Sequence, residues 1–304
     1  MANSTQTQSV PALIECDRLR HSYAGKQVLN GLSFQVRKGG IHGLLGKNGA
    51  GKTTTINILM GFLEPSGGGC RVLGDPSHLL RPETRRKIGL LHEGFTQHDF
   101  MTIAELEKFY RHFYPHWQPQ VFTQLVQKLP VPSSRRLSKL SFGQRSQVCL
   151  ALIMAQLPEL MILDDYSMGL DAGYRRLLLD YLHAYAEEYG TTILLTSHVV
   201  QDLERLIDHM FIIQNGSLLY SAVRGRFFES LRQWRFQRSP QADQLERTAV
   251  LTSVEHIGRH SIVCSFHDEA QVRQALLQKG VMPEDWQEIP LSFEDAFLSL
   301  TGKY

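Results

Sequence analysis

Apolar residues in this chain gather in short runs, which polar or glycine-rich stretches separate. Runs that are apolar throughout are typical of strands buried on both faces of a parallel sheet. Between them lie longer stretches in which apolar residues recur at helical spacing. The predicted strands are 13–19, 28–36, 41–45, 88–91, 160–163 and 192–196, and the predicted helices are 54–60, 81–87, 142–156 and 175–189. The pattern favours an α/β protein.

The pattern changes near residue 222. Arginines are mixed with aromatic residues over 224–238, which predicts an amphipathic helix that packs on the main domain with its arginines extended to water. Contact of this helix with phospholipid headgroups or with a partner is the alternative. Farther on, 249–254 and 261–266 alternate like strands, and 269–279 has helical spacing. We therefore expect a small α+β accessory domain at this end of the chain.

Composition narrows the class of protein. The 304 residues are 42% hydrophobic and 20% charged, which suits one large domain with a smaller one, or two domains. The net charge of +2 gives no indication of a nucleic-acid partner. No apolar run approaches the length of a membrane span, and the first ten residues lack the order of a signal peptide. The four cysteines are far apart in the sequence, which favours reduced thiols over a disulfide scaffold.

A phosphate-binding pattern follows the predicted strand 41–45. Residues 46–53 read Gly-Lys-Asn-Gly-Ala-Gly-Lys-Thr and fit G-x-x-x-x-G-K-[ST], with a predicted helix directly after them. The glycines let backbone N–H groups point inward, and the helix N-terminus adds a partial positive charge. We expect Lys52 to reach the β- and γ-phosphates and Thr53 to offer its hydroxyl to Mg²⁺. The sequence therefore predicts a nucleoside triphosphate site.

Other candidate residues stand at the ends of predicted strands, where ligands of open α/β sheets bind. Asp164 is placed to hold Mg²⁺ and Asp165 to hold an attacking water, although a pair of aspartates after a strand is also a common turn opener. His198 can reach a γ-phosphate or cap the following helix. Tyr23 can stack on an adenine ring or be a half-buried tyrosine at a strand end.

The order of these motifs resembles the ATP-binding subunit of ABC transporters, over about residues 12–222. In this resemblance 46–53 is the Walker A loop, 140–144 (Leu-Ser-Phe-Gly-Gln) the signature, 160–164 the Walker B strand and 169–171 the D-loop. The resemblance implies three groups of site residues: for ATP, Tyr23, Gly46, Asn48, Gly49, Ala50, Gly51, Lys52, Thr53, Thr54, Ser141, Gly143 and Gln144; for Mg²⁺, Thr53, Glu93 and Asp164; for catalysis, Asp165 and His198.

The resemblance also implies a fold and an assembly. We expect a P-loop NTPase fold of the ABC ATPase type, with a RecA-like core sheet, an antiparallel β subdomain and a helical subdomain at about 94–157. Residues 1–11 are expected to be flexible and 223–304 to form the accessory domain. Two such subunits, identical or different, would meet head to tail with ATP between them. Membrane-spanning subunits would be separate polypeptides, which puts this chain at the cytoplasmic face of a bacterial inner membrane.

Two further stretches resemble particular branches of this family. Residues 291–302 are similar to the closing motif of ATPase subunits that serve ABC-2-type exporters, with an ordinary C-terminal amphipathic helix as the alternative. Residues 113–117 together with 137–141 are similar to a branch near antibiotic-resistance and lantibiotic exporters. The resemblance therefore implies an ATPase that powers export by a separate permease.

Three residues depart from the family pattern. Asp165 replaces a glutamate, and a carboxylate set back by about 1.5 Å can lower the rate roughly 100-fold, which predicts slow hydrolysis and long-lived closed dimers. Glu93 replaces a glutamine and favours tight metal binding. Phe142 replaces a glycine and either crowds the phosphate or points away. Four alternatives remain: a dimer that pairs a degenerate ATP site with a standard one, a dimer with two slow ATP sites, an ATP-gated regulator or scaffold, and a soluble ABC ATPase outside transport.

Overall fold

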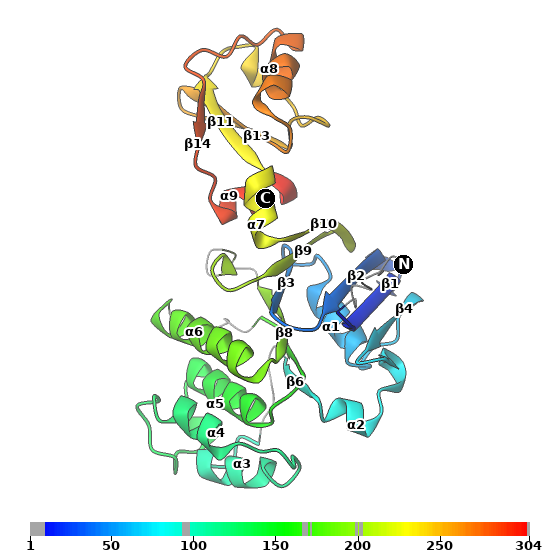
Figure 1. Ribbon diagram of the computed structural model, residues 1–304, viewed down its shortest axis with the longest axis vertical. Coiled ribbons are helices and arrows are strands. Elements are labelled where there is room, and N and C mark those ends of the chain that lie inside the picture. The colour runs from blue at the N-terminus through cyan, green and yellow to red at the C-terminus, as the bar shows by residue number, and fades with distance from the viewer. Residues whose placement is uncertain are drawn as a thin grey trace, which may run out of the picture. The chain divides into compact units, whose positions relative to one another are not determined.

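The computed structural model describes residues 10–92, 98–165, 170, 172–197, 200 and 203–302 (Figure 1). Contacts divide the chain into two compact units, residues 1–221 and 222–304. None of the helices in the described ranges combines the length and the apolar character needed to cross a membrane.

A six-stranded sheet forms the centre of the first unit, in the order β10-β9-β3-β8-β7-β6. Neighbours from β9 to β6 pair in parallel. Strands β3, β7 and β8 are buried at every residue, which explains why their sequences are largely apolar. The strands are β3 (Ile41–Leu45), β6 (Ile88–Leu91), β7 (Leu160–Leu163), β8 (Thr192–Ser197), β9 (His209–Gln214) and β10 (Ser217–Val223).

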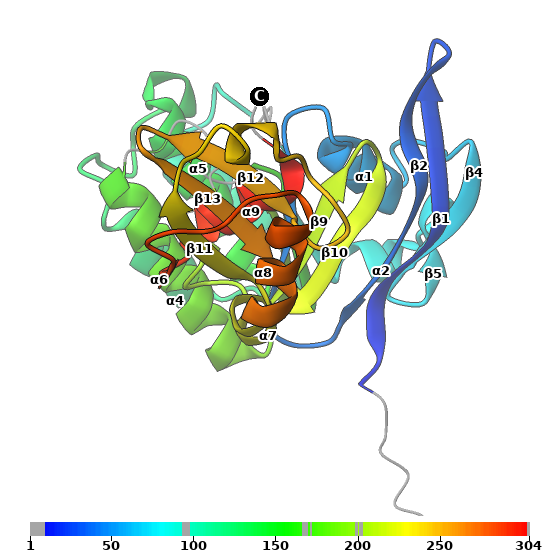
Figure 2. The same ribbon diagram turned by 90° about the horizontal axis from the view of Figure 1, so that it is seen from above.

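A second, antiparallel sheet has the order β2-β1-β4-β5, and Figure 2 shows these strands side by side. They are β1 (Ala12–Tyr23), β2 (Lys26–Arg37), β4 (Gly67–Val72) and β5 (Asp75–Pro76). Strand β1 runs on to Tyr23, beyond the end of the strand predicted at 13–19. Only Ala24 and Gly25 form the turn, with φ of 45° and 83°, and two successive positive φ angles match the twist of a two-residue hairpin.

Helix α1 (Lys52–Leu59) connects the two sheets. It contacts β2 and β4, and its residues Ile56 and Leu59 belong to one buried core with residues of both sheets. In the same core the rings of Phe34 and Phe211 lie 5.0 Å apart. This shared core fixes the phosphate loop between the sheets.

The remaining helices of the first unit are α2 (Pro82–Arg85), α3 (Ile103–Tyr110), α4 (Pro119–Val126), α5 (Phe142–Ala155) and α6 (Ala172–Tyr189). Figure 1 shows α3, α4 and α5 grouped together, and α4 packs on α5. Every residue of α5 from Ser146 to Ala155 is buried. The hydroxyl of Tyr185 on α6 donates a 2.7 Å hydrogen bond to the Met154 carbonyl on α5. Helices α3, α4 and α5 lie within residues 94–157, where a helical subdomain is expected.

The second unit has its own sheet, in the order β12-β13-β11-β14. Its elements are α7 (Arg224–Ser230), β11 (Arg232–Gln237), β12 (Ser253–Ile257), β13 (His260–Ser265), α8 (Glu269–Gln278), β14 (Gln287–Ile289) and α9 (Phe293–Thr301). The single helix expected over 224–238 is wrong. Trp234 and Phe236 are fully buried two residues apart, on one face of β11, so the second half of the segment follows the period of a strand. The strand expected at 249–254 begins only at Ser253.

Candidate functional site

Glycines shape the loop between β3 and α1. Gly49 and Gly51 have φ of 79° and 105°, in the left-handed region that glycine adopts without strain. A Cβ on Gly46 would lie 2.7 Å from the Ile213 carbonyl oxygen, and one on Gly51 would lie 2.6 Å from Leu29 Cδ2. The glycines at 46 and 51 are therefore required by close packing.

Lys52 begins α1 and folds back over this loop. Its Nζ donates to the carbonyl oxygens of Gly46 at 2.6 Å and of Lys47 at 3.1 Å. Gly51, the N-cap of α1, makes no side-chain capping bond, so the N-terminal N–H groups of the helix are suited to an anion. The ammonium group and the helix terminus converge on one place, as phosphate binding requires.

A hydrogen-bonded group of oxygens lies where β7 and β8 end. Asp164 is 2% exposed, and its Oδ1 accepts hydrogen bonds from Thr196 Oγ1 at 2.8 Å and from Thr53 Oγ1 at 3.4 Å. Its Oδ2 is buried without a hydrogen-bond partner among the described residues. A buried carboxylate oxygen of this kind, beside a threonine hydroxyl, has the hard oxygen chemistry that Mg²⁺ prefers.

Protein side chains alone do not complete this metal site. Across the described residues, no three histidine, cysteine, aspartate or glutamate side chains are gathered so as to hold a metal ion. Mg²⁺ commonly binds through one or two carboxylates together with substrate phosphates, so the arrangement around Asp164 fits a metal that arrives with a nucleotide.

Asp165 has an unusual backbone conformation. Its φ is 44°, in the left-handed region that aspartate tolerates better than most residues. Its N–H donates a 2.9 Å hydrogen bond to Thr196 Oγ1. Thr196 was not among the residues that we expected at the site. The only signal for it in the sequence is a hydroxyl residue at the end of an apolar strand.

These groups line one cleft of about 980 Å³. Tyr23, at the end of β1, forms part of its wall, is 47% exposed and meets the His21 ring edge to face at 4.6 Å. Sequence reasoning did not identify the cleft residues that the start of β2 contributes, which are Lys26, Gln27 and Val28. The described residues that line the cleft are Tyr23, Lys26, Gln27, Val28, Asn48, Gly49, Gly51, Lys52, Thr53, Thr54, Asp164, Asp165, Thr196 and Asn215.

The remaining expected residues are elsewhere. Gly46 and Ala50 belong to the loop without lining the cleft. Glu93 and His198 lie outside the described residues, as do residues 169 and 171 of the expected D-loop. Of the expected residues, the structure therefore brings Tyr23, Lys52, Thr53, Asp164 and Asp165 together at one cleft.

The expected signature, residues 140–144, stands at the start of α5 and is not among the described residues that line the cleft. Ser141 is the N-cap: its Oγ accepts from the Gln144 N–H at 3.3 Å, and the Gln144 side chain accepts from the Ser141 N–H at 3.0 Å. This capping box holds the first turn at the surface of the subunit. Phe142 is 42% exposed, so its ring extends toward solvent from the same turn.

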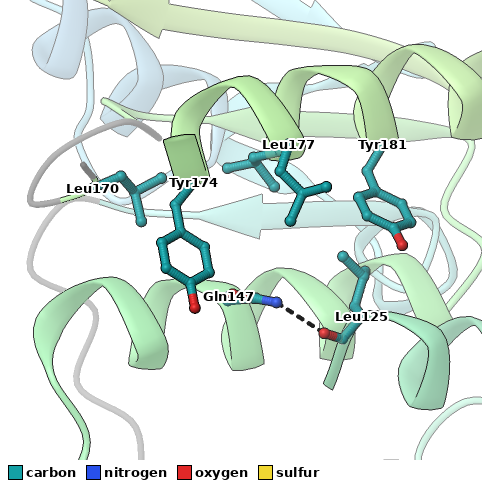
Figure 3. A pocket seen from close by; sticks show the side chains of 7 residues that line it. Leu125, Gln147, Leu170, Tyr174, Leu177 and Tyr181 are labelled. Atoms are coloured by element: carbon teal, nitrogen blue, oxygen red, sulfur yellow. Dashed lines mark hydrogen bonds between the residues drawn. The ribbon is translucent and has the colours of Figure 1, made fainter. Parts of the chain in front are cut away.

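A second hollow, of about 10 Å³, lies between α4, α5 and α6 (Figure 3). Leu170, Tyr174 and Tyr181 give it apolar walls, and Gln147 Nε2 donates to the Leu125 carbonyl at 2.8 Å beside it. A space of this size holds about one water molecule, so it is a packing defect rather than a site for a nucleotide.

Residues 29–167 match the ABC transporter family. A Nod factor export ATP-binding protein I from Rhizobium sp. (strain N33) is 31% identical over 299 residues, which cover 95% of this chain and 97% of the relative. The protein of that name from Burkholderia orbicola (strain AU 1054) is 30% identical over 303 residues, which cover 96% of this chain and 98% of the relative.

Solved structures of ATP-binding proteins superimpose on this chain. An ATP-binding subunit of an ABC transporter superimposes with a TM-score of 0.63 at 26% identity, over 71% of this chain and 92% of the other. A dimeric ATP-binding cassette bound to ADP and phosphate has a TM-score of 0.62 at 17% identity, over 69% of this chain and 98% of the other, and shows the fold alone. With relatives aligned along almost their whole length and a nucleotide cleft of this kind, the chain belongs to the ATP-binding subunits of ABC transporters, which bind and hydrolyse ATP.

Proposed function

We propose that this subunit powers export by a separate ABC-2-type permease, through ATP-driven closure of a dimer at the cytoplasmic face of a bacterial inner membrane. The observation that carries the proposal is the convergence of the phosphate loop, Asp164 and Asp165 on one cleft. The names of the Rhizobium and Burkholderia relatives support the direction of transport, because both are export ATP-binding proteins that align with this chain into its C-terminal unit.

ATP would bind with its adenine ring on Tyr23 and its phosphates in the loop of residues 46–53. The exposed face of the tyrosine offers a stacking surface at the mouth of the cleft. Lys52 would exchange the carbonyl oxygens of Gly46 and Lys47 for phosphate oxygens, which carry more negative charge. Asn48, Gly49, Ala50, Gly51 and Thr54 complete this cradle, mainly through backbone N–H groups.

Thr53 and Asp164 are the residues that would hold Mg²⁺, and the unpartnered Oδ2 of Asp164 supports this assignment. The metal would neutralise charge on the β- and γ-phosphates. We assign Glu93 to the same site from its place in the sequence. The Thr196 hydroxyl would hold the Asp164 carboxylate in its orientation through its hydrogen bond to Oδ1.

Asp165 is our candidate for the group that orients the attacking water, with His198 as a second contact to the γ-phosphate. The aspartate is shorter than the glutamate that the family uses, so we propose that turnover is slow. The constrained backbone of Asp165, fixed by its hydrogen bond to Thr196, defines where the short carboxylate can reach.

The first turn of α5, with Ser141 at its N-cap, would complete the ATP site of a second subunit. This second subunit can be a copy of this chain or a different ATPase. Ser141 caps α5 at an exposed position, and Gly143 and Gln144 follow it in the first turn. This exposed helix terminus supports contact with the γ-phosphate of the facing subunit. Phe142 stands on the same surface, where it would influence how closely the subunits approach.

Exposed aromatic residues support a docking surface for a membrane subunit. Phe100, Phe109 and Phe113 are 68%, 38% and 56% exposed. The Phe109 ring lies 5.1 Å from Phe113 and 5.3 Å from His98, and the His98 ring lies 5.8 Å from Phe100, so the three phenylalanines and His98 are contiguous. Contiguous exposed aromatic side chains are typical of protein–protein contacts.

The test is Mg²⁺-dependent ATP turnover of the wild type, Lys52→Ala and Asp165→Asn, each alone and in membranes with the co-purified permease. Loss of turnover in both variants, together with stimulation of the wild type by the permease, is the expected result. Tight ATP binding without turnover in any form would favour an ATP-gated regulator. Failure to recover any integral membrane partner would favour a soluble ATPase outside transport.

A further inference from the structure

Two cysteines face each other across the antiparallel pair β1 and β4. Cys16 pairs with Cys70 in the register of the two strands, and their side chains are 6% and 8% exposed. Cys149 and Cys264 are buried in other elements. The two cysteines are more than fifty positions apart in the sequence, so their pairing could not be recognised from the sequence alone.

The hydrogen-bond pattern places Cys16 and Cys70 at the closer kind of cross-strand position. The Leu73 N–H donates to the Leu13 carbonyl, so residues 13 and 73 form a hydrogen-bonded pair. Such pairs alternate with non-hydrogen-bonded ones along an antiparallel ladder, and three steps lead from 13 and 73 to the cysteines. At a non-hydrogen-bonded pair the Cα atoms are about 4.5 Å apart, within the range of roughly 4.4–6.8 Å in which disulfides occur.

The two thiols differ in access and acidity. Cys70 lines a cleft of about 520 Å³, and its Sγ lies 3.0 Å from Ser77 Oγ. The contact with Cys16 lowers the pKa of Cys70, whereas burial raises the pKa of Cys16. Cys70 is therefore the thiol suited to meet an oxidant, and Cys16 the one suited to react with the oxidised Cys70.

We propose that Cys16 and Cys70 form a reversible intramolecular disulfide, with hydrogen peroxide as the oxidant. The Cys70 thiolate attacks one peroxide oxygen, the O–O bond breaks, and the departing hydroxide takes a proton to become water. The Cys16 sulfur then attacks the resulting sulfenic acid: an S–S bond forms, the S–O bond breaks, and the hydroxyl leaves with the Cys16 proton as a second water. Two thiols lose two electrons in total, and the peroxide gains them.

The cleft beside Cys70 favours an uncharged oxidant. Glu15, Asp17 and Glu64 contribute carboxylates to its lining, and Arg71 is the one arginine among the described residues that line it. An anionic disulfide would be repelled by this surplus of negative charge, but hydrogen peroxide would not.

The disulfide would close a covalent loop that contains the phosphate-binding residues 46–53. It would also tie β1, which ends at Tyr23, to β4, which packs against α1. A cross-link across a long loop restricts the unfolded chain, so we expect the oxidised protein to melt at a higher temperature than the reduced protein.

The experiment treats the full-length chain with hydrogen peroxide, blocks remaining thiols and maps peptides by mass spectrometry without reduction. A peptide pair joined through Cys16 and Cys70, lighter by two hydrogens and separated by dithiothreitol, is expected, together with a higher melting temperature. Cys149→Ser is the matched control and should keep the link. Cys70→Ser should abolish it, and Cys16→Ser should leave a sulfenic acid on Cys70 that dimedone traps.

The peptide map of the wild-type protein tests the proposal even if a serine variant does not fold. The proposal would be overturned if all four thiols can still be alkylated after treatment with peroxide. A disulfide that joins other cysteines, or one that joins two chains, would overturn it as well. A link that forms with oxidised glutathione but not with hydrogen peroxide would overturn the choice of oxidant.

Discussion

The Thr196 hydroxyl joins the two aspartates at the end of β7: it donates to Asp164 Oδ1 at 2.8 Å and accepts from the Asp165 N–H at 2.9 Å. A hydrogen bond to a charged group contributes about 1.5–3 kcal/mol. We therefore predict that Thr196→Val lowers ATP turnover by roughly ten- to a hundredfold and raises the Mg²⁺ concentration needed for half-maximal turnover.

Serine at position 196 keeps the hydroxyl, so Thr196→Ser should restore most of the turnover. Thr192→Val is a control on the same strand, because the Thr192 hydroxyl accepts from the Gly39 N–H at the opposite end of β8. If Thr192→Val and Thr196→Val change the Mg²⁺ dependence equally, the Thr196 hydroxyl has no particular role at the site.

Lengthening Asp165 tests whether the short carboxylate limits turnover. We predict that Asp165→Glu raises the rate by up to about 100-fold, because the carboxylate would reach farther into the cleft. The left-handed backbone at this position opposes the gain, since a residue other than glycine, asparagine or aspartate loses about 1–2 kcal/mol there. Steady-state turnover and urea unfolding, measured on the same preparation, separate the two effects.

Asp165→Asn retains the length and the backbone tolerance of aspartate and removes only the charge. Its turnover should be lower than that of the wild type. Equal turnover of the asparagine variant and the wild type would mean that another group orients the water.

Two glycines of the phosphate loop should respond differently to alanine. At Gly51 a Cβ meets Leu29 Cδ2 at 2.6 Å and φ is 105°, so strain and a clash act together. At Gly49 nothing lies within 4 Å of the added atom, and only the positive φ of 79° opposes it. We predict that Gly49→Ala lowers the free energy of unfolding by about 1 kcal/mol, and Gly51→Ala by more. Urea denaturation of the two variants, which differ only in position, measures the contribution of the clash.

The pair of His42, which is buried, and His209, which is half-buried, should make stability depend on pH. These residues are paired in the register of β3 and β9, with ring centroids 6.0 Å apart. Burial lowers the pKa of both from the ordinary value of 6.5, and the neighbouring His42 lowers that of His209 further.

A lowered pKa means that the unfolded chain takes up these protons more readily than the folded protein. The contribution to stability is therefore complete above about pH 6.5 and is lost as the pH falls below it. We predict a steeper decrease in melting temperature between pH 7.5 and 5.5 for the wild type than for His209→Gln. Parallel melting curves of the two proteins over this range would exclude the pair as the cause.

Much of the nucleotide site was predictable from the sequence because its parts are local. Strand β3, the glycine loop and α1 follow one another within twenty residues, and every residue in β3, β7 and β8 is buried, so pattern and structure agree. Asp164 was identified for the same reason, since a carboxylate directly after a buried strand lies at the sheet edge where ligands bind.

Contacts between distant segments were decided only by the tertiary structure. Thr196 reaches Asp164 across 32 positions because β8 is hydrogen-bonded to β7. Cys16 faces Cys70 only in the register that β1 and β4 adopt. Over 224–238 the mixture of arginine and aromatic residues indicated a helix, but the burial of Trp234 and Phe236 in the second unit's own core selected a strand for the second half. Local sequence determines which backbone conformations are available, but strand register and burial arise from partners that the sequence does not place side by side.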